Sequence, residues 1–172
     1  MSISIHVTNT VVDDGYIYEK PGKRGAMLPA PLYSVQITSD QIEHSFLVTR
    51  DTVRSLERAP AVQYGVAGEC PPNKTDEPYH ARIRTDGPRG FRLELFEPSL
   101  CIDRSPNLLR GIGPDERTSI QIHIGPGHSD GCFLLTDDEA GRDAFATALR
   151  SLMPEGTLPE ILVTVSDRHT KS

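Results

Sequence analysis

The chain has 172 residues, enough for one domain with a hydrophobic core. Hydrophobic residues make up 37% of it and charged residues 24%, which is typical of a soluble globular protein. The net charge of −6 argues against a nucleic-acid partner, and no apolar run approaches the ~20 residues that a membrane span needs. The 14 glycines and 14 prolines predict short elements, many turns and a β-rich fold.

The first seventy residues predict an N-terminal β-rich segment of unassigned role. Apolar and polar residues alternate, as in half-buried strands, over 2–8, 15–20, 32–38 and 44–50. Proline and glycine predict a loop over 20–31. A short helix over 51–59 can be capped by Asp51 or Thr52. The strongest candidate linker is 68–78, where Pro71 and Pro72 forbid a regular element.

Residues 71–172 form the second predicted region, within what is expected to be one compact domain overall. Strands over 79–85 and 90–96 flank an Asp-Gly-Pro-Arg-Gly turn, a strong hairpin pattern. A long irregular segment, 97–119, precedes a strand over 119–124, and an apolar run begins at Cys132. The helix over 137–153 follows, capped by Asp137 or Asp138, and the last strand is 160–166. The predicted class is therefore α+β, mostly β, with one main helix.

The cysteines, Cys70, Cys101 and Cys132, are odd in number, so at most one disulfide can form. None belongs to a CxxC pair, so no metal site is expected.

Cys132 follows a glycine-rich turn that separates it from His123, which ends a predicted strand. A tight turn brings these two ends together, so His123 can act as the base that activates a Cys132 nucleophile. Pairing a thiolate with an imidazolium lowers the pKa of the thiol. Gly131 leaves room for substrate, and main-chain groups of Gly131 and Cys132 can shape an oxyanion site. The alternative is a buried structural thiol, because cysteine often simply fills space in a core.

The stretch from His123 to Phe133 resembles the signature of the L,D-transpeptidase catalytic domain. That signature places a histidine and a glycine at the end of a strand, then a loop, then Ser-His-Gly-Cys and an aliphatic residue. Here it reads His123-Ile124-Gly125, then Ser129-Asp130-Gly131-Cys132-Phe133. Small phage and secretion-associated relatives are still more similar, and the similarity covers residues 78–166. It implies an L,D-transpeptidase-like sheet or sandwich with the main helix after the catalytic cysteine.

The sequence departs from this signature at three points. Asp130 stands where the second histidine is usual, the loop is short, and Leu134 replaces a polar residue. These changes affect substrate contacts more than thiol chemistry. His128 can take over part of the missing histidine's role, or it can be a solvated loop residue. Ser129 can orient His123, or it can be a turn hydroxyl that bonds its own backbone.

The resemblance implies attack on an L,D-bond of peptidoglycan stem peptides without a cofactor. Cys132 is the expected nucleophile and His123 the base; hydrolysis, cross-linking and D-amino-acid exchange all stay open as outcomes. Arginines of the predicted hairpin, with His128 and Asp130, are candidate substrate contacts, since guanidinium groups bind carboxylates in pairs of hydrogen bonds. These arginines are Arg82, Arg84, Arg89 and Arg92, with Arg104 and Arg110 as similar candidates. A solvated hairpin face is the alternative.

No signal peptide is recognisable at the N-terminus, yet the implied substrate lies outside the cytoplasm. We therefore expect a protein made in the cytoplasm and exported as a type VI-like antibacterial effector into a target periplasm, with a secretion-machine delivery protein and an immunity protein as partners. A Cys70–Cys101 disulfide is compatible with that compartment. The alternatives are a phage lysis protein, an inactive muropeptide-binding or assembly module, and a cysteine amidase or peptidase of other specificity.

Overall fold

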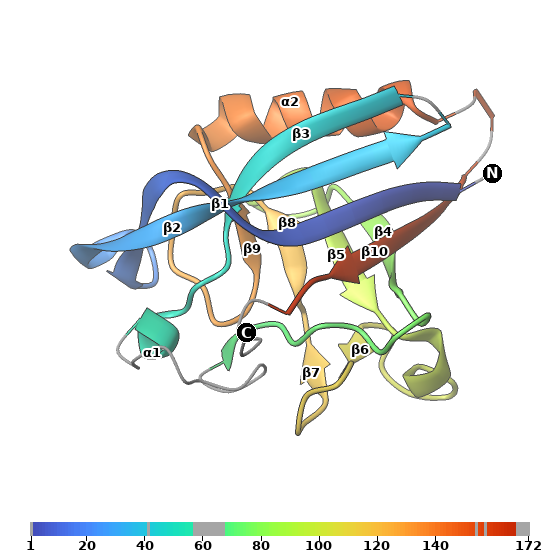
Figure 1. Ribbon diagram of the computed structural model, residues 1–172, viewed down its shortest axis with the longest axis horizontal. Helices are drawn as coiled ribbons and strands as arrows, with labels where there is room; N and C mark the ends of the chain where they lie inside the picture. Colours follow the sequence, from blue (N-terminus) through green and yellow to red (C-terminus); the bar gives the residue numbers. More distant parts are fainter. Residues whose placement is uncertain (1, 41, 57–67, 154, 157, 168–172) are drawn as a thin grey trace.

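The computed structural model describes residues 2–40, 42–56, 68–153, 155–156 and 158–167 (Figure 1). Strands account for 47% of the chain and helices for 14%, with one main helix, which confirms the predicted mostly-β α+β class. The strands are β1 (Ser2–Lys20), β2 (Arg24–Ser39), β3 (Ile42–Thr49), β4 (Tyr79–Arg84), β5 (Arg92–Phe96), β6 (Leu108–Leu109), β7 (Arg117–Thr118), β8 (Gln121–His123), β9 (Phe133–Leu135) and β10 (Glu160–Val165). The helices are α1 (Val53–Leu56), η2 (Pro98–Leu100, a 3-10 turn) and α2 (Asp138–Ser151).

Eight strands close into a barrel in the order β1-β10-β4-β5-β8-β9-β3-β2. The pairs β1–β10 and β8–β9 are parallel, and the other pairs around the barrel are antiparallel. The first seventy residues supply β1, β2 and β3 to the same barrel as the later strands. The predicted N-terminal segment is therefore part of the wall that carries the signature.

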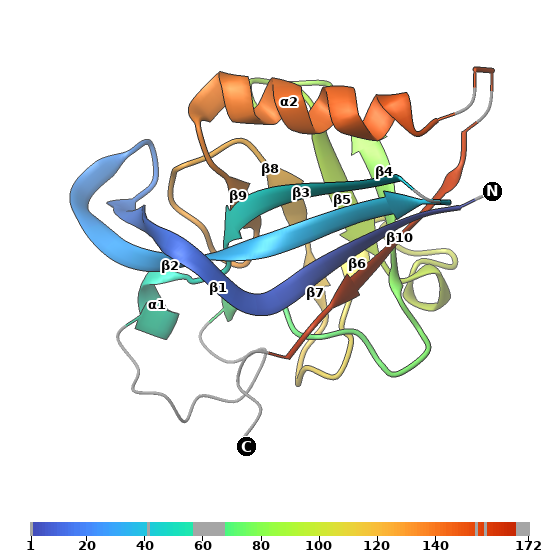
Figure 2. The same cartoon turned by 45° about the horizontal axis from the view of Figure 1, so that its top comes forward.

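The hydrophobic core fills the barrel and continues under α2, which lies along one side of it (Figure 2). Alternation in β1 points Ile3, Ile5 and Val7 inward, because successive side chains of a strand face opposite sides. Phe145 of α2 is fully buried, and its ring meets those of Phe46 and Phe91 edge-on. This packing attaches α2 to the barrel.

The loop predicted over 20–31 is mostly strand, and that prediction was wrong. β1 and β2 continue past the barrel as a two-stranded arm, in which Pro29 pairs with Tyr16 and Pro31 with Asp14 (Figure 1). Prolines are tolerated there because each arm strand has only one neighbour, so an N–H facing outward is not needed. The arm contacts the turn between β8 and β9, where the Tyr18 N–H donates to the Gly127 carbonyl over 2.9 Å.

The other predicted elements differ less. The hairpin of β4 and β5, the main helix and the last strand are confirmed. The capping mechanism is not: Asp137 precedes α2 in a left-handed conformation, and its side chain makes no capping bond. Residues 57–59 of the predicted 51–59 helix lie outside the described residues. No helix in the described part of the chain is long and apolar enough to cross a membrane.

Candidate active site

The site begins where β8 and β9 run side by side. Their parallel register pairs Ile122 with Phe133 and His123 with Leu134. Ile122 and Phe133 point into the main core, so their neighbours His123 and Cys132 are turned to the outer side of the barrel wall. Leu134 packs there in a second, small cluster with Ile17 of the arm, and Cys132 lies against it. The predicted proximity of the two strand ends is confirmed.

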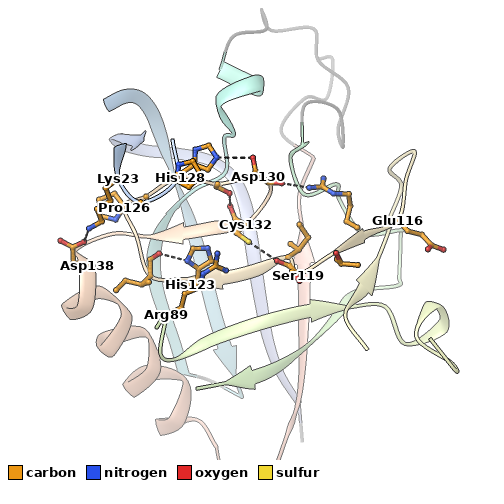
Figure 3. A pocket seen from close by; sticks show the side chains of 18 residues that line it. Lys23, Arg89, Glu116, Ser119, His123, Pro126, His128, Asp130, Cys132 and Asp138 are labelled. Carbon is orange, nitrogen blue, oxygen red and sulfur yellow. Dashed lines mark hydrogen bonds and ion pairs between the residues drawn. The ribbon is translucent and has the colours of Figure 1, made fainter. Parts of the chain in front are cut away.

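A pocket of about 700 Å³ opens on this outer side (Figure 3). The arm tip, the segment before β8 and the turn before β9 form its walls. Its lining residues are Pro21, Gly22, Lys23, Arg89, Glu116, Arg117, Thr118, Ser119, Ile120, His123, Ile124, Pro126, Gly127, His128, Ser129, Asp130, Cys132 and Asp138. Five of the predicted site residues, namely Cys132, His123, Ser129, His128 and Asp130, are thus brought together on one pocket.

His123 is held in one orientation. Its side chain is buried, and Nδ1 lies 2.8 Å from the carbonyl oxygen of Ile124. Because a carbonyl only accepts hydrogen bonds, Nδ1 carries the proton and Nε2 keeps its lone pair in the neutral ring. Burial, helped by the positive charge of Arg89, lowers the pKa of His123 to about 4. The imidazole is therefore neutral at physiological pH, with Nε2 able to accept a proton.

Cys132 is half-buried, and its Sγ donates to the carbonyl oxygen of Ser119 over 3.3 Å. Burial raises the pKa of the Cys132 thiol, and a backbone hydrogen bond from Gln121 and the charges of Arg89 and Arg117 partly oppose that rise. The resting pair is thus a thiol and a neutral imidazole. This corrects the expected thiolate–imidazolium pair: the burial that holds the two groups in place disfavours both charges.

Hydrogen bonds of Ser129 hold the turn before Cys132 in place. Ser129 is buried; its Oγ donates to the carbonyl oxygen of Cys132 over 2.8 Å and accepts the Gly131 N–H over 3.1 Å. Ser129 is therefore the turn hydroxyl of the alternative interpretation, and it makes no hydrogen bond to His123. The Gly131 N–H is already used, so it is not a free oxyanion donor. Gly131 itself has φ 137°, and a Cβ there would lie 2.6 Å from the Gly68 carbonyl oxygen.

Asp130, which stands where the second histidine is usual, and His128, which can take over part of that histidine's role, also lie on the pocket. His128 Nδ1 is 3.1 Å from the Tyr18 carbonyl oxygen, which ties the turn to the arm. The His128 Nε2 atom lies 3.4 Å from the Asp130 carboxylate, and the Asp130 side chain is 90% exposed. His128 is thus a structural contact as well as a pocket residue, rather than a freely solvated one.

Three of the hairpin arginines proposed as substrate contacts lie outside the pocket. Arg82 donates to the Pro106 carbonyl and lies over the Phe96 ring. Arg84 is paired with Asp86 and Glu94. Arg92 is buried and donates to the Asp86 and Gly90 carbonyls. These partners hold the hairpin together, so the assignment of these three side chains to substrate is not supported by their positions.

Of the weaker arginine candidates, Arg104 is paired with Glu116 on the pocket rim, at 2.6 Å. Arg110 donates to the Gly113 carbonyl and does not line the pocket. Arg89, grouped with the hairpin by sequence, is the hairpin arginine that does line it.

Sequence reasoning missed two contacts that build the pocket. Arg117 donates to the carbonyls of Gly68 and Asp130, at 2.7 and 2.6 Å, and so joins two distant loops. Lys23 at the arm tip pairs with Asp138 at the start of α2, 2.9 Å away. Their partners are between 13 and 115 residues away in the sequence, so no local pattern indicates them.

The three cysteines are free thiols, so the structure contains no Cys70–Cys101 bridge. Within the described residues, no group of three or more His, Cys, Asp or Glu side chains is placed to hold a metal ion. The chain matches no protein-family model, no curated protein and no solved structure.

Proposed function

We propose that the protein is a cysteine-dependent enzyme that transfers or hydrolyses acyl groups of peptides. The observation that carries the proposal is the placement of Cys132 and His123 on one pocket, at the ends of neighbouring strands, with Nδ1 of His123 bound to a carbonyl. That bond leaves Nε2 as the proton acceptor, which is the role that a base beside a nucleophile requires.

The chemistry begins from the neutral pair. Sγ of Cys132 attacks the carbonyl carbon while its proton passes to Nε2 of His123. When the C–N bond breaks, that proton goes to the departing amine and an acyl-thioester remains on Cys132. Water then gives a proton to Nε2 and its oxygen to the acyl carbon, and the S–C bond breaks and the sulfur regains the proton. An amine in place of water forms a new peptide bond instead.

The substrate is proposed from the resemblance of residues 123–133 to the L,D-transpeptidase signature. It is the L,D-bond of a peptidoglycan stem peptide, with D-alanine leaving from the diaminopimelate carbonyl. A pocket of about 700 Å³ has room for several residues of such a peptide. Action in a target periplasm as a type VI-like effector, with an immunity protein over the Cys132 pocket and a delivery protein, belongs to the same proposal.

The test is mass spectrometry of purified muropeptides incubated with the wild type, Cys132→Ala and Cys101→Ala. Cys101 is a matched control because its thiol lies outside the pocket and donates to the Leu108 carbonyl. We expect tetrapeptides to become tripeptides, or to gain exchanged D-amino acids, with the wild type and Cys101→Ala only. Unchanged muropeptides with all three proteins would remove the enzyme proposal.

A second candidate is a muropeptide-binding module without turnover. The raised pKa of Cys132 favours it, because the thiol lacks the pre-formed thiolate of many cysteine enzymes. A binding measurement beside the same incubation distinguishes the two candidates. A binding module should bind the tetrapeptide saturably and form no product.

A further inference from the structure

We propose that Arg89 binds the free carboxylate of the residue that follows the scissile bond, so that the site selects peptides ending one residue beyond the attacked carbonyl. The inference rests on the proposed function and narrows its substrate class. A site of this kind recognises the C-terminal end of a peptide and does not cleave bonds within a longer chain.

The Arg89 guanidinium is positioned by a chain of hydrogen bonds from the barrel wall. Its Nη1 donates to Oε1 of Gln121 over 2.7 Å, and Nε2 of Gln121 donates to the Glu94 carboxylate over 3.2 Å. Gln121 and Glu94 are both buried, and Arg84 holds the same Glu94 carboxylate at 3.0 Å. The amide of Gln121 can therefore orient the guanidinium without neutralising its charge. One further donor is engaged by the Cys132 side chain, and the remaining donors can bind a ligand.

The other pocket cations are already committed. Lys23 is paired with Asp138, and Arg117 donates to three main-chain carbonyls, those of Gly68, Glu69 and Asp130. Within the described part of the chain, Arg89 has no carboxylate in ion-pair contact. A positive charge that lines a pocket without a counter-charge favours an anionic ligand group.

The pocket's carboxylates do not cancel that charge. Glu116 is held by Arg104, Asp138 by Lys23, and the Asp130 side chain points to solvent beside His128. The three acidic groups thus have partners of their own, and Arg89 is the pocket arginine whose charge acts on both His123 and Cys132.

Arg89 also lies beside the reacting groups, since it lines the same pocket as His123 and Cys132 and forms a side-chain hydrogen bond with Cys132. Its charge also acts on both His123 and Cys132, lowering the pKa of each. In a peptide that ends one residue after the scissile bond, the terminal carboxyl carbon is only about 3–4 Å from the attacked carbonyl carbon. A cation beside the nucleophile reaches that carboxylate, whereas a longer peptide offers a neutral amide at the same place.

The experiment compares a muropeptide tetrapeptide with the same molecule carrying a C-terminal amide. Affinities for both are measured by calorimetry in the Cys132→Ala background, with Arg89 intact, as Arg89→Gln and as Arg89→Lys. Turnover of both is measured in the proteins that keep Cys132. Arg54→Gln is the matched control, because Arg54 is an exposed arginine of α1 that does not line the pocket. Thermal unfolding checks that each variant is folded.

With Arg89 intact, we expect the free acid to bind about 10- to 100-fold more tightly than the amide, the effect of one charge-assisted contact. Arg89→Gln should remove that preference by weakening the acid alone, and Arg89→Lys should keep part of it. Equal affinities for acid and amide, or an equal loss on both in Arg89→Gln, would overturn the inference. Because binding is measured without Cys132, an absence of turnover in the wild type defeats the proposed function while leaving this test intact.

Discussion

At the scale of single residues, the site combines reactive side chains with surroundings that suppress their charges. Burial lowers the pKa of His123 and raises that of Cys132, so neither is ionised at neutral pH. In the reaction that we propose, proton transfer therefore accompanies attack by sulfur instead of preceding it. Because the thiolate is the reactive form, we expect Cys132 to react slowly with general electrophiles at neutral pH.

This neutral pair predicts the pH dependence of thiol alkylation. The rate of Cys132 modification by iodoacetamide, followed by peptide mass spectrometry, should be low at pH 7 and should still be rising above pH 9, because the thiolate is the reacting form. The unfolded protein gives the comparison, with its cysteines titrating near their ordinary value of about 8.5. A plateau of rapid modification between pH 5 and 7 would instead indicate an ion pair and contradict this assignment.

At the scale of elements, the turn between β8 and β9 controls where Cys132 lies. Gly131 adopts a backbone conformation that side chains rarely tolerate, and it passes close to both the Gly68 carbonyl and the Arg117 guanidinium. Ser129 and Arg117 then hold the turn from its two sides. The position of the thiol is thus set by loops that are far apart in sequence.

Gly131→Ala should therefore damage both stability and the site. We expect a loss of about 1–3 kcal/mol in the free energy of unfolding, from strain at φ 137° and the contact of the new Cβ with the Gly68 oxygen. Gly127→Ala is the matched control in the same turn, since its Cβ would meet only Leu134, at 3.9 Å. Urea denaturation measures the difference; equal stability of the two variants would show that the turn relaxes freely.

Some of these elements could be predicted from the sequence and others could not. The hairpin of β4 and β5, helix α2 and the placement of His123 and Cys132 on one pocket follow from local patterns and a short loop. The arm could not be predicted in this way. Its prolines indicate a loop, because proline is excluded from a strand paired on both sides, and the sequence does not show that the arm strands are paired on one side only. Arg117 and Lys23 were missed because their partners are distant in the sequence, and Arg89 could not be separated from its hairpin neighbours because only the turn geometry sends it into the pocket.

At the scale of the whole molecule, one core supports the barrel, α2 and the site. Phe145 is fully buried between Phe46 of β3 and Phe91 beside β5, with ring centroids 5.3 and 6.3 Å away. The helix that it anchors begins at Asp138, which lines the pocket and holds Lys23. Packing on one side of the barrel is therefore connected to the pocket mouth.

Phe145→Ala should reduce the free energy of unfolding by about 3–5 kcal/mol, the usual cost of deleting a buried aromatic ring. Phe96→Ala is the comparison, because Phe96 is half-buried beneath Arg82 and away from this cluster, so its loss should be smaller. Guanidinium unfolding curves for the three proteins test the order. A larger loss in Phe96→Ala would mean that α2 contributes little to the stability of the barrel.

The parallel pairing of β1 with β10 aligns Ser2 with Glu160 and Val7 with Val165, so the barrel is closed by strands from opposite ends of the described chain. During synthesis, β1 leaves the ribosome long before its neighbour is made. Until β10 arrives, β1 and β4 each present an unpaired edge to the cell, and such edges favour association with other chains. The nascent chain therefore needs protection from association through these two edges until β10 has been translated.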